Sequence, residues 1–187
     1  MQLVKWAHDL TESLLADSLP QRWAHSQRVY SQALTLAPAL GDDAELLAAA
    51  AIAHDVGYAQ AAVETGQHMI DGARYLRDVA GADSRLCSIV AFHTSSSWEA
   101  SELGLDGALG EFEPAEPELV DAITYCDLTS TPTGDLADPA ERLSEVLERY
   151  GPEHVVFRAV SAARPELMAR VTRVQRRRAE AVYATFN

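Results

Sequence analysis

The chain lacks any apolar run long enough to cross a membrane. The longest uninterrupted stretch of apolar residues, Leu46 to Ala53, has eight residues, whereas a membrane-spanning helix needs roughly 20. The first residues also lack the basic start and apolar core of a signal peptide. We therefore expect a cytoplasmic protein without a membrane partner.

Cysteines and basic residues are also scarce. The two cysteines, Cys87 and Cys126, do not have metal-site spacing, so we expect buried free thiols in a reducing compartment. The chain has 15 lysines and arginines against 28 aspartates and glutamates, which gives a net charge of −13. A polyanion is bound by a basic surface, so we expect no nucleic-acid polymer as a partner. The composition leaves a homo-oligomer open.

The alternating pattern of β-strands is missing, and apolar residues recur instead at helical spacing. We predict an all-α protein whose single domain, a helical bundle, spans residues 1–187. Pro20, Pro117, Pro139 and Pro165 mark helix starts. The predicted helices cover residues 3–18, 21–36, 43–55, 70–79, 84–93, 117–128, 139–150, 153–162 and 165–184. Residues 94–116 and 129–138 are predicted to be loops.

Several residues of a metal-binding type lie where an apolar helix face should carry a hydrophobic side chain. His93 lies on the stripe of Leu86 and Val90, and Asp127 lies on the stripe of Ile123. A single histidine on such a face is usually part of a core. A buried carboxylate without a partner, however, costs several kcal/mol, so Asp127 needs a cation nearby.

The pair His54 and Asp55 ends the alanine-rich run and is followed by Gly57. His54 shares a face with Ala51, and His25 lies on an apolar face of its own predicted helix. Neutral imidazoles and ionised carboxylates together suit a divalent ion, which also removes the cost of burying the acids. The combination predicts a metal centre more strongly than any of these residues alone.

The order of His25, then His54 and Asp55, then Asp127 resembles the signature of the HD-domain superfamily of metal-dependent phosphohydrolases. The strings "RWAHSQRV", "AIAHDVGY" and "DAITYCD" are similar to it as well. The resemblance covers about residues 20–130 and implies a metal-bearing helical core of the HD type there. Residues 139–187 then form a C-terminal helical extension that packs on this core.

Two further histidines, His68 and His93, lie between the doublet and the last aspartate, as in HD proteins with two metals. The resemblance thus implies six ligands: His25, His54, Asp55, His68, His93 and Asp127. In this arrangement Asp55 bridges two ions. His25, His54 and Asp127 bind one ion, and His68 and His93 bind the other. We expect one or two divalent ions, iron or manganese first, with magnesium, cobalt, nickel or zinc as alternatives.

Some positions depart from the family pattern. Tyr58 stands where several two-metal groups have a lysine or histidine. Thr94 stands where those groups have a second histidine directly after the last interior one. The glycine-tyrosine-proline extension of the cyclic-dinucleotide phosphodiesterases is missing after His93. We therefore do not expect a cyclic dinucleotide as the substrate.

The expected reaction is hydrolysis of a phosphoester or phosphoanhydride of a nucleotide or small phosphorylated metabolite by metal-activated water. Asp55 and Arg22 are the predicted catalytic residues. Arg22, Arg28 and Arg74 are the predicted substrate-binding residues, because a guanidinium binds phosphate through its forked donors. A surface salt bridge is the alternative for each arginine.

Two alternatives stay open. The first is a mixed-valence di-iron oxygenase, because some HD-fold proteins with the same ligands resemble enzymes of that kind. The lysine-rich segment expected in that branch is absent here. A non-catalytic nucleotide-binding sensor is the other alternative.

The arginines between Arg170 and Arg178 form the single basic cluster, which we interpret as a solvated helix face.

Overall fold

The computed structural model describes residues 2–185, and within this range it contains helices but no β-strand. The prediction of an all-α, single-domain fold is confirmed. In chain order the elements are α1 (Gln2–Leu15), α2 (Pro20–Leu34), α3 (Ala37–Leu40), η1 (Gly41–Asp43), α4 (Ala44–Ala53), η2 (Val56–Tyr58), α5 (His68–Asp78), α6 (Ser84–Ala91), α7 (Ser96–Leu103), α8 (Asp106–Leu109), α9 (Pro117–Leu128), α10 (Pro139–Arg149) and α11 (Val155–Thr185). None of these helices is long and apolar enough to span a membrane.

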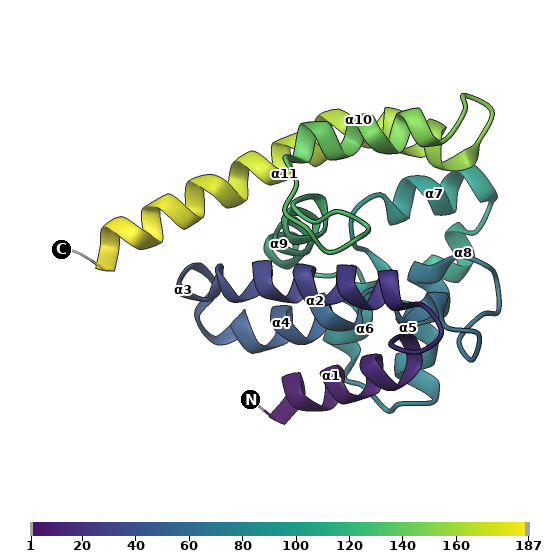
Figure 1. The fold of residues 1–187 in the computed structure, drawn as a ribbon, viewed down its shortest axis with the longest axis horizontal. Coiled ribbons are helices and arrows are strands. Elements are labelled where there is room, and N and C mark those ends of the chain that lie inside the picture. The colour runs from purple at the N-terminus through teal and green to yellow at the C-terminus, as the bar shows by residue number, and fades with distance from the viewer. Residues whose placement is uncertain (1, 186–187) are drawn as a thin grey trace.

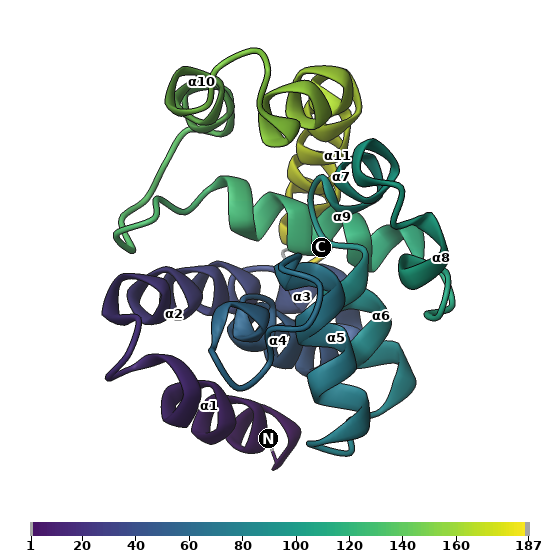
Figure 2. The same ribbon diagram turned by 90° about the vertical axis from the view of Figure 1, so that its right-hand side faces the viewer.

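Helix α4 is the centre of the core. Every residue from Leu46 to Ala53 is buried, because the helix is apolar on all sides and is enclosed by α1, α2, α6 and α9 (Figure 2). Its many alanines have short side chains, which lets these neighbours approach closely. The end of α4 therefore lies deep inside the molecule, where its last turn meets several other helices.

The C-terminal helices α10 and α11 form a layer over α9 and α7 (Figure 1). The last turns of α11 project beyond the rest of the molecule. One side of α11 carries the buried residues Ala159, Ala163, Leu167 and Val171 at helical spacing. This stripe attaches the layer to the core.

The prediction that Pro165 begins a helix is wrong. Pro165 lies inside α11, so the two helices predicted at 153–162 and 165–184 are one. A proline inside a helix costs about 3 kcal/mol. The buried stripe runs without interruption past this position, from Ala163 to Leu167, and its burial offsets that cost.

Residues 94–116 are not simply a loop, because they contain α7 and α8. The serine-rich start of α7 and its few apolar residues hid the helical period. The structure shows where α7 ends, since Gly104 adopts a left-handed conformation with φ 69°, which glycine enters without steric cost.

The basic cluster of α11 is only partly solvated, in contrast to the interpretation from the sequence. Arg173 donates two hydrogen bonds, of 2.7 and 2.8 Å, to the buried carboxylate of Asp121 on α9. Arg178 donates to the hydroxyl of Tyr125. Arg176, by comparison, is exposed. Several of these arginines therefore hold α11 on α9.

Candidate metal centre

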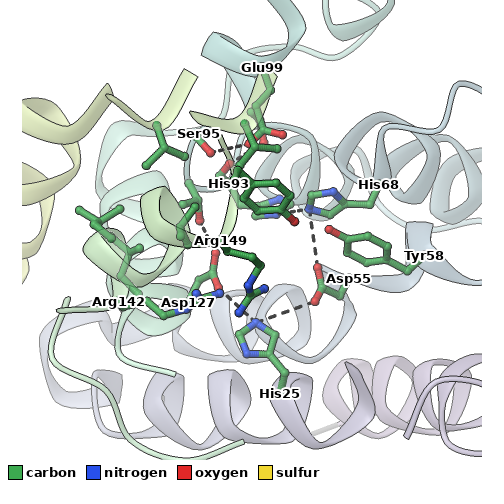
Figure 3. A pocket seen from close by; sticks show the side chains of 18 of the residues that line it. His25, Asp55, Tyr58, His68, His93, Ser95, Glu99, Asp127, Arg142 and Arg149 are labelled. Atoms are coloured by element: carbon green, nitrogen blue, oxygen red, sulfur yellow. Dashed lines mark hydrogen bonds and ion pairs between the residues drawn. The ribbon is translucent and has the colours of Figure 1, made fainter. Parts of the chain in front are cut away.

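The six predicted ligands come from distant parts of the chain and lie close together, and five of them line one cavity (Figure 3). One lies on α2, two directly follow α4, one begins α5, one follows α6 and one lies on α9: His25, His54, Asp55, His68, His93 and Asp127. Five of them line the cavity: His25, Asp55 and His93 are buried, and His68 and Asp127 are partly exposed. His54 does not line the cavity and has 1% of its surface exposed. The fold thus brings together all the residues that the family resemblance implies as ligands.

A first group consists of His25, His54 and Asp127. One donor atom from each lies within 4.8 Å of the other two. The Nε2 atom of His25 is 3.1 Å from Oδ1 of Asp127, and the His25 and His54 rings meet edge to face with their centroids 5.2 Å apart. Two imidazoles and one carboxylate thus surround one point.

A second group consists of Asp55, His68 and His93, whose donor atoms also lie within 4.8 Å of one another. The Nε2 atoms of His68 and His93 are 3.1 Å apart, and Oδ1 of Asp55 is 3.7 Å from Nε2 of His68. The other oxygen of Asp55, Oδ2, is 3.8 Å from Nε2 of His25 in the first group. Asp55 therefore faces both groups.

The protein backbone orients three of the histidines. The Nδ1 atoms of His25, His54 and His93 lie 2.9, 2.9 and 2.6 Å from the carbonyl oxygens of Thr131, Ala51 and Val90. A carbonyl oxygen only accepts, so Nδ1 carries a hydrogen, and in the neutral ring the Nε2 lone pair faces the cavity. Metal-binding histidines are commonly fixed in this way by a hydrogen bond from the other ring nitrogen.

The Nε2 atom of His54 shows that these residues fit a cation. This atom is buried and has no hydrogen-bond partner among residues 2–185. It lies 3.5 Å from Oδ1 of Asp55, so a lone pair faces a carboxylate oxygen across a short gap. A divalent ion that binds both atoms removes this repulsion, and the mixed nitrogen and oxygen donors suit iron, manganese or zinc.

The protonation states of the histidines also suit metal binding. Burial lowers the pKa of His54, and burial lowers the pKa of His68 to about 3, more than the nearby Asp55 raises it. Both rings are therefore neutral near pH 7, which is the form that coordinates a metal.

The two aspartates are ionised. Burial alone would raise the pKa of Asp55, but the neighbouring cationic groups, foremost the Arg22 guanidinium that donates to it, hold this pKa below its usual range. Burial likewise opposes ionisation of Asp127, and the close contact with the His25 ring outweighs it and holds the pKa of Asp127 well below the usual value. Burial lowers the pKa of His25, but the same contact and Asp55 outweigh burial and raise it. The centre therefore combines two ionised carboxylates with the neutral rings of His54 and His68.

Gly57 explains how His68 reaches the centre. A Cβ atom at Gly57 would lie 1.9 Å from the carbonyl oxygen of His68 and 2.6 Å from the amide nitrogen of Gly72, so this position has room only for hydrogen. The α5 backbone packs directly on η2 in consequence. His68 stacks on Tyr58, with ring centroids 4.3 Å apart. The helix begins at His68 rather than at Ile70 as predicted.

Thr94 is a site residue that the sequence did not reveal. It is the one non-glycine residue within 2–185 with a positive φ, 48°, a conformation that is costly for a β-branched side chain. Its hydroxyl donates a 2.5 Å hydrogen bond to Oδ2 of Asp127. The strained turn after His93 therefore orients the carboxylate of Asp127. The only sequence signal was that Thr94 occupies the place of a second histidine.

The three arginines predicted to bind phosphate have different positions. Arg22 lines the cavity, its Nη1 donates to Oδ2 of Asp55 over 2.9 Å, and its guanidinium lies 4.1 Å from the ring centroid of Tyr58. Arg28 and Arg74 do not line the cavity. Arg28 donates to the carbonyl oxygen of Gly134, and Arg74 pairs with two surface glutamates. Arg74 therefore forms surface salt bridges, which was the alternative to phosphate binding. Arg28 holds the loop after α9 in place.

Other parts of the cavity wall come from residues that sequence reasoning missed. Arg142, Arg149 and Tyr150 reach it from α10 and its end, and Glu99 reaches it from α7. Glu99 is buried and accepts a 2.6 Å hydrogen bond from Ser95. The cavity volume is about 120 Å³, which admits a compact ligand. No spacing rule connects these residues to the ligands, because they come together only through helix packing.

Comparison with known proteins identifies the family. The family model of the HD domain matches residues 22–131, which include all six candidate ligands and exclude α10 and α11. No curated protein and no solved structure gives a significant match. The resemblance inferred from the sequence is confirmed, and the chain belongs to the HD domain family.

Proposed function

We propose that the chain is a metal-dependent phosphohydrolase that cleaves a phosphoester or phosphoanhydride of a nucleotide or small phosphorylated metabolite. The family is mostly made up of metal-dependent phosphohydrolases. The observation that carries the proposal is the set of inward-facing nitrogen and carboxylate donors around Asp55. The volume of the cavity supports a small substrate.

We assign His25, His54 and Asp127 to one divalent ion and His68 and His93 to a second, with Asp55 between them. Iron or manganese is the expected metal. Bound divalent ions lower the pKa of water towards neutrality and neutralise the charge that develops on a transferring phosphoryl group. Asp55 contributes by accepting a hydrogen bond from the attacking water and orienting it. Its lowered pKa makes it a weak general base.

Arg22 is the proposed phosphate contact among the three predicted arginines. Its side chain is held on two sides, by the hydrogen bond to Asp55 and by the ring of Tyr58. The fork has five N–H donors, so donors remain for phosphate oxygens while one binds Asp55. A fixed guanidinium next to the ions also stabilises the more negative transition state.

The test is phosphate release from a panel of phosphomonoesters and nucleotides by protein loaded with manganese or iron. We expect release that depends on added metal and is lost in Asp55→Asn. Oxygen uptake without phosphate release would indicate the oxygenase alternative. Tight nucleotide binding with neither activity would indicate the sensor.

A further inference from the structure

Helix α10 places two arginines in the wall of the metal cavity, outside the matched family domain. Arg142 and Arg149 are seven residues apart, so they share one face of the helix, and both line the cavity. Figure 3 shows Arg142 on the Asp127 side of the cavity, away from His68. The candidate ligands thus form one part of the cavity wall, and a helix outside the matched family domain forms another.

These arginines are not partners of the metal-binding carboxylates. Both pair with Glu145, which lies between them on α10. Within residues 2–185, neither comes within 4.0 Å of a carboxylate oxygen of Asp55 or Asp127. Within residues 2–185 the two guanidinium groups share this one carboxylate, so their positive charge exceeds that of their ion-pair partner. The carboxylate of Glu99, which also lines the cavity, bonds instead to Ser95.

The surroundings make that charge significant. Arg142 has only 13% of its side chain exposed, and the adjacent Leu143 is buried. Val146 and Val160 extend the same wall with apolar surface. A cation beside apolar side chains is incompletely solvated, so an anionic ligand gains more there than it would in open water.

The metal end of the cavity already has its own cationic groups. Arg22 is bonded to Asp55, and the six donors there would hold cations that bind the reacting phosphate. The Arg142 and Arg149 pair is thus available for a different group. We propose, resting on the proposed function, that the substrate is a compact phosphate ester with a second anionic group, a carboxylate or a second phosphate, which Arg142 and Arg149 bind.

This assignment gives each part of the cavity a separate task. The reacting phosphate lies at the six donors and Arg22, and the second anion lies at α10. The carbon atoms between them lie against Val146 and Val160. Glu145 partly neutralises the arginines and so limits the affinity for the anion.

The test compares two small esters that differ at one end. Glycerol 3-phosphate ends in a hydroxymethyl group, and 3-phosphoglycerate has a carboxylate in its place. Calorimetric titration of the full-length, manganese-loaded protein should show about tenfold tighter binding of 3-phosphoglycerate, as expected for hydrogen bonds to a charged group. Equal affinity, or no binding of either ester, would overturn the inference.

Three variants connect the preference to α10. Arg142→Ala and Arg149→Ala should each reduce the preference for 3-phosphoglycerate at least severalfold. Glu145→Gln should increase it, because the arginines lose their neutralising partner. This opposite sign is not expected if the three residues only stabilise the helix. Arg176→Ala, on the exposed part of α11, is the matched control and should keep the full preference.

Failure of this inference can be distinguished from failure of the proposed function. Phosphate release without a preference for a second anion would contradict the role of α10 and leave the phosphohydrolase intact. A preference that follows the arginines in calorimetry, without phosphate release from any ester, would support the anion site and contradict the phosphohydrolase.

Discussion

The two walls of the cavity hold their charged side chains in different ways. In the wall formed by the HD domain, three histidine rings are fixed by backbone carbonyl oxygens, and Asp127 is held by the strained Thr94. In the wall formed by α10, the one ion-pair partner of Arg142 and Arg149 among residues 2–185 is Glu145 on the same helix. We call the first wall the rigid wall, because bonds from several parts of the chain fix its donors and orient them for a metal. The arginines of the second wall depend on one helix.

The largest expected effect comes from removing a ligand in the rigid wall. His54→Ala should abolish metal binding and phosphate release, because it removes the donor that faces Asp55. Elemental analysis by mass spectrometry would measure the metal, and circular dichroism should show nearly unchanged helix content. His8→Ala, a partly exposed histidine outside the cavity, is the control. Normal metal content in His54→Ala would contradict the assignment.

A backbone change should separate the two halves of the metal centre. Gly57→Ala places a methyl group against the carbonyl oxygen of His68, so α5 must move and take His68 with it. We expect loss of one of the two ions, a lower melting temperature and strongly reduced phosphate release. Gly107→Ala is the matched control, because a Cβ atom there meets nothing within 4 Å. Two ions per chain in Gly57→Ala would rule out His68 as a ligand.

The support of Asp127 can be tested without removing a ligand. Thr94→Val keeps the branched shape but removes the hydroxyl that donates to Asp127. Loss of such a supporting hydrogen bond typically lowers metal affinity or activity about 10- to 100-fold. Metal titration would measure this, with Thr172→Val on α11, which bonds only to its own helix, as the control. Unchanged affinity would assign Thr94 a purely structural role.

The smallest effect is expected where the C-terminal layer attaches to the core. Arg173→Ala leaves the buried Asp121 without its bidentate partner, which should lower the free energy of unfolding by about 1–3 kcal/mol. Arg177 stays near Asp121 and limits the loss. Metal content should not change. Chemical denaturation measures the stability, and a simultaneous loss of metal would show that the two layers are coupled.

The sequence singled out most of the candidate ligands in the rigid wall because they break a local rule. His93 and Asp127 stand on apolar stripes, and a helix built from such stripes must bury them. His68 was less evident, because its position depends on the contact between Gly57 and α5, which periodicity does not reveal. The family resemblance supplied it.

The second wall could not be predicted in the same way. Arg142 and Arg149 lie on a strongly amphipathic helix, where arginines usually face solvent, and only the packing of α10 on α11 places them at the cavity. Arg28 and Arg74 show the opposite case, since closeness in sequence to a ligand did not bring them to the cavity.

The metal content of the purified full-length protein, measured by elemental analysis without chelators, tests the central claim most directly. The arrangement around Asp55 predicts about two iron or manganese ions per chain. About one ion would restrict the site to the first group with Asp55. No bound metal, even after incubation with manganese or iron, would contradict the metal centre and with it the proposed phosphohydrolase.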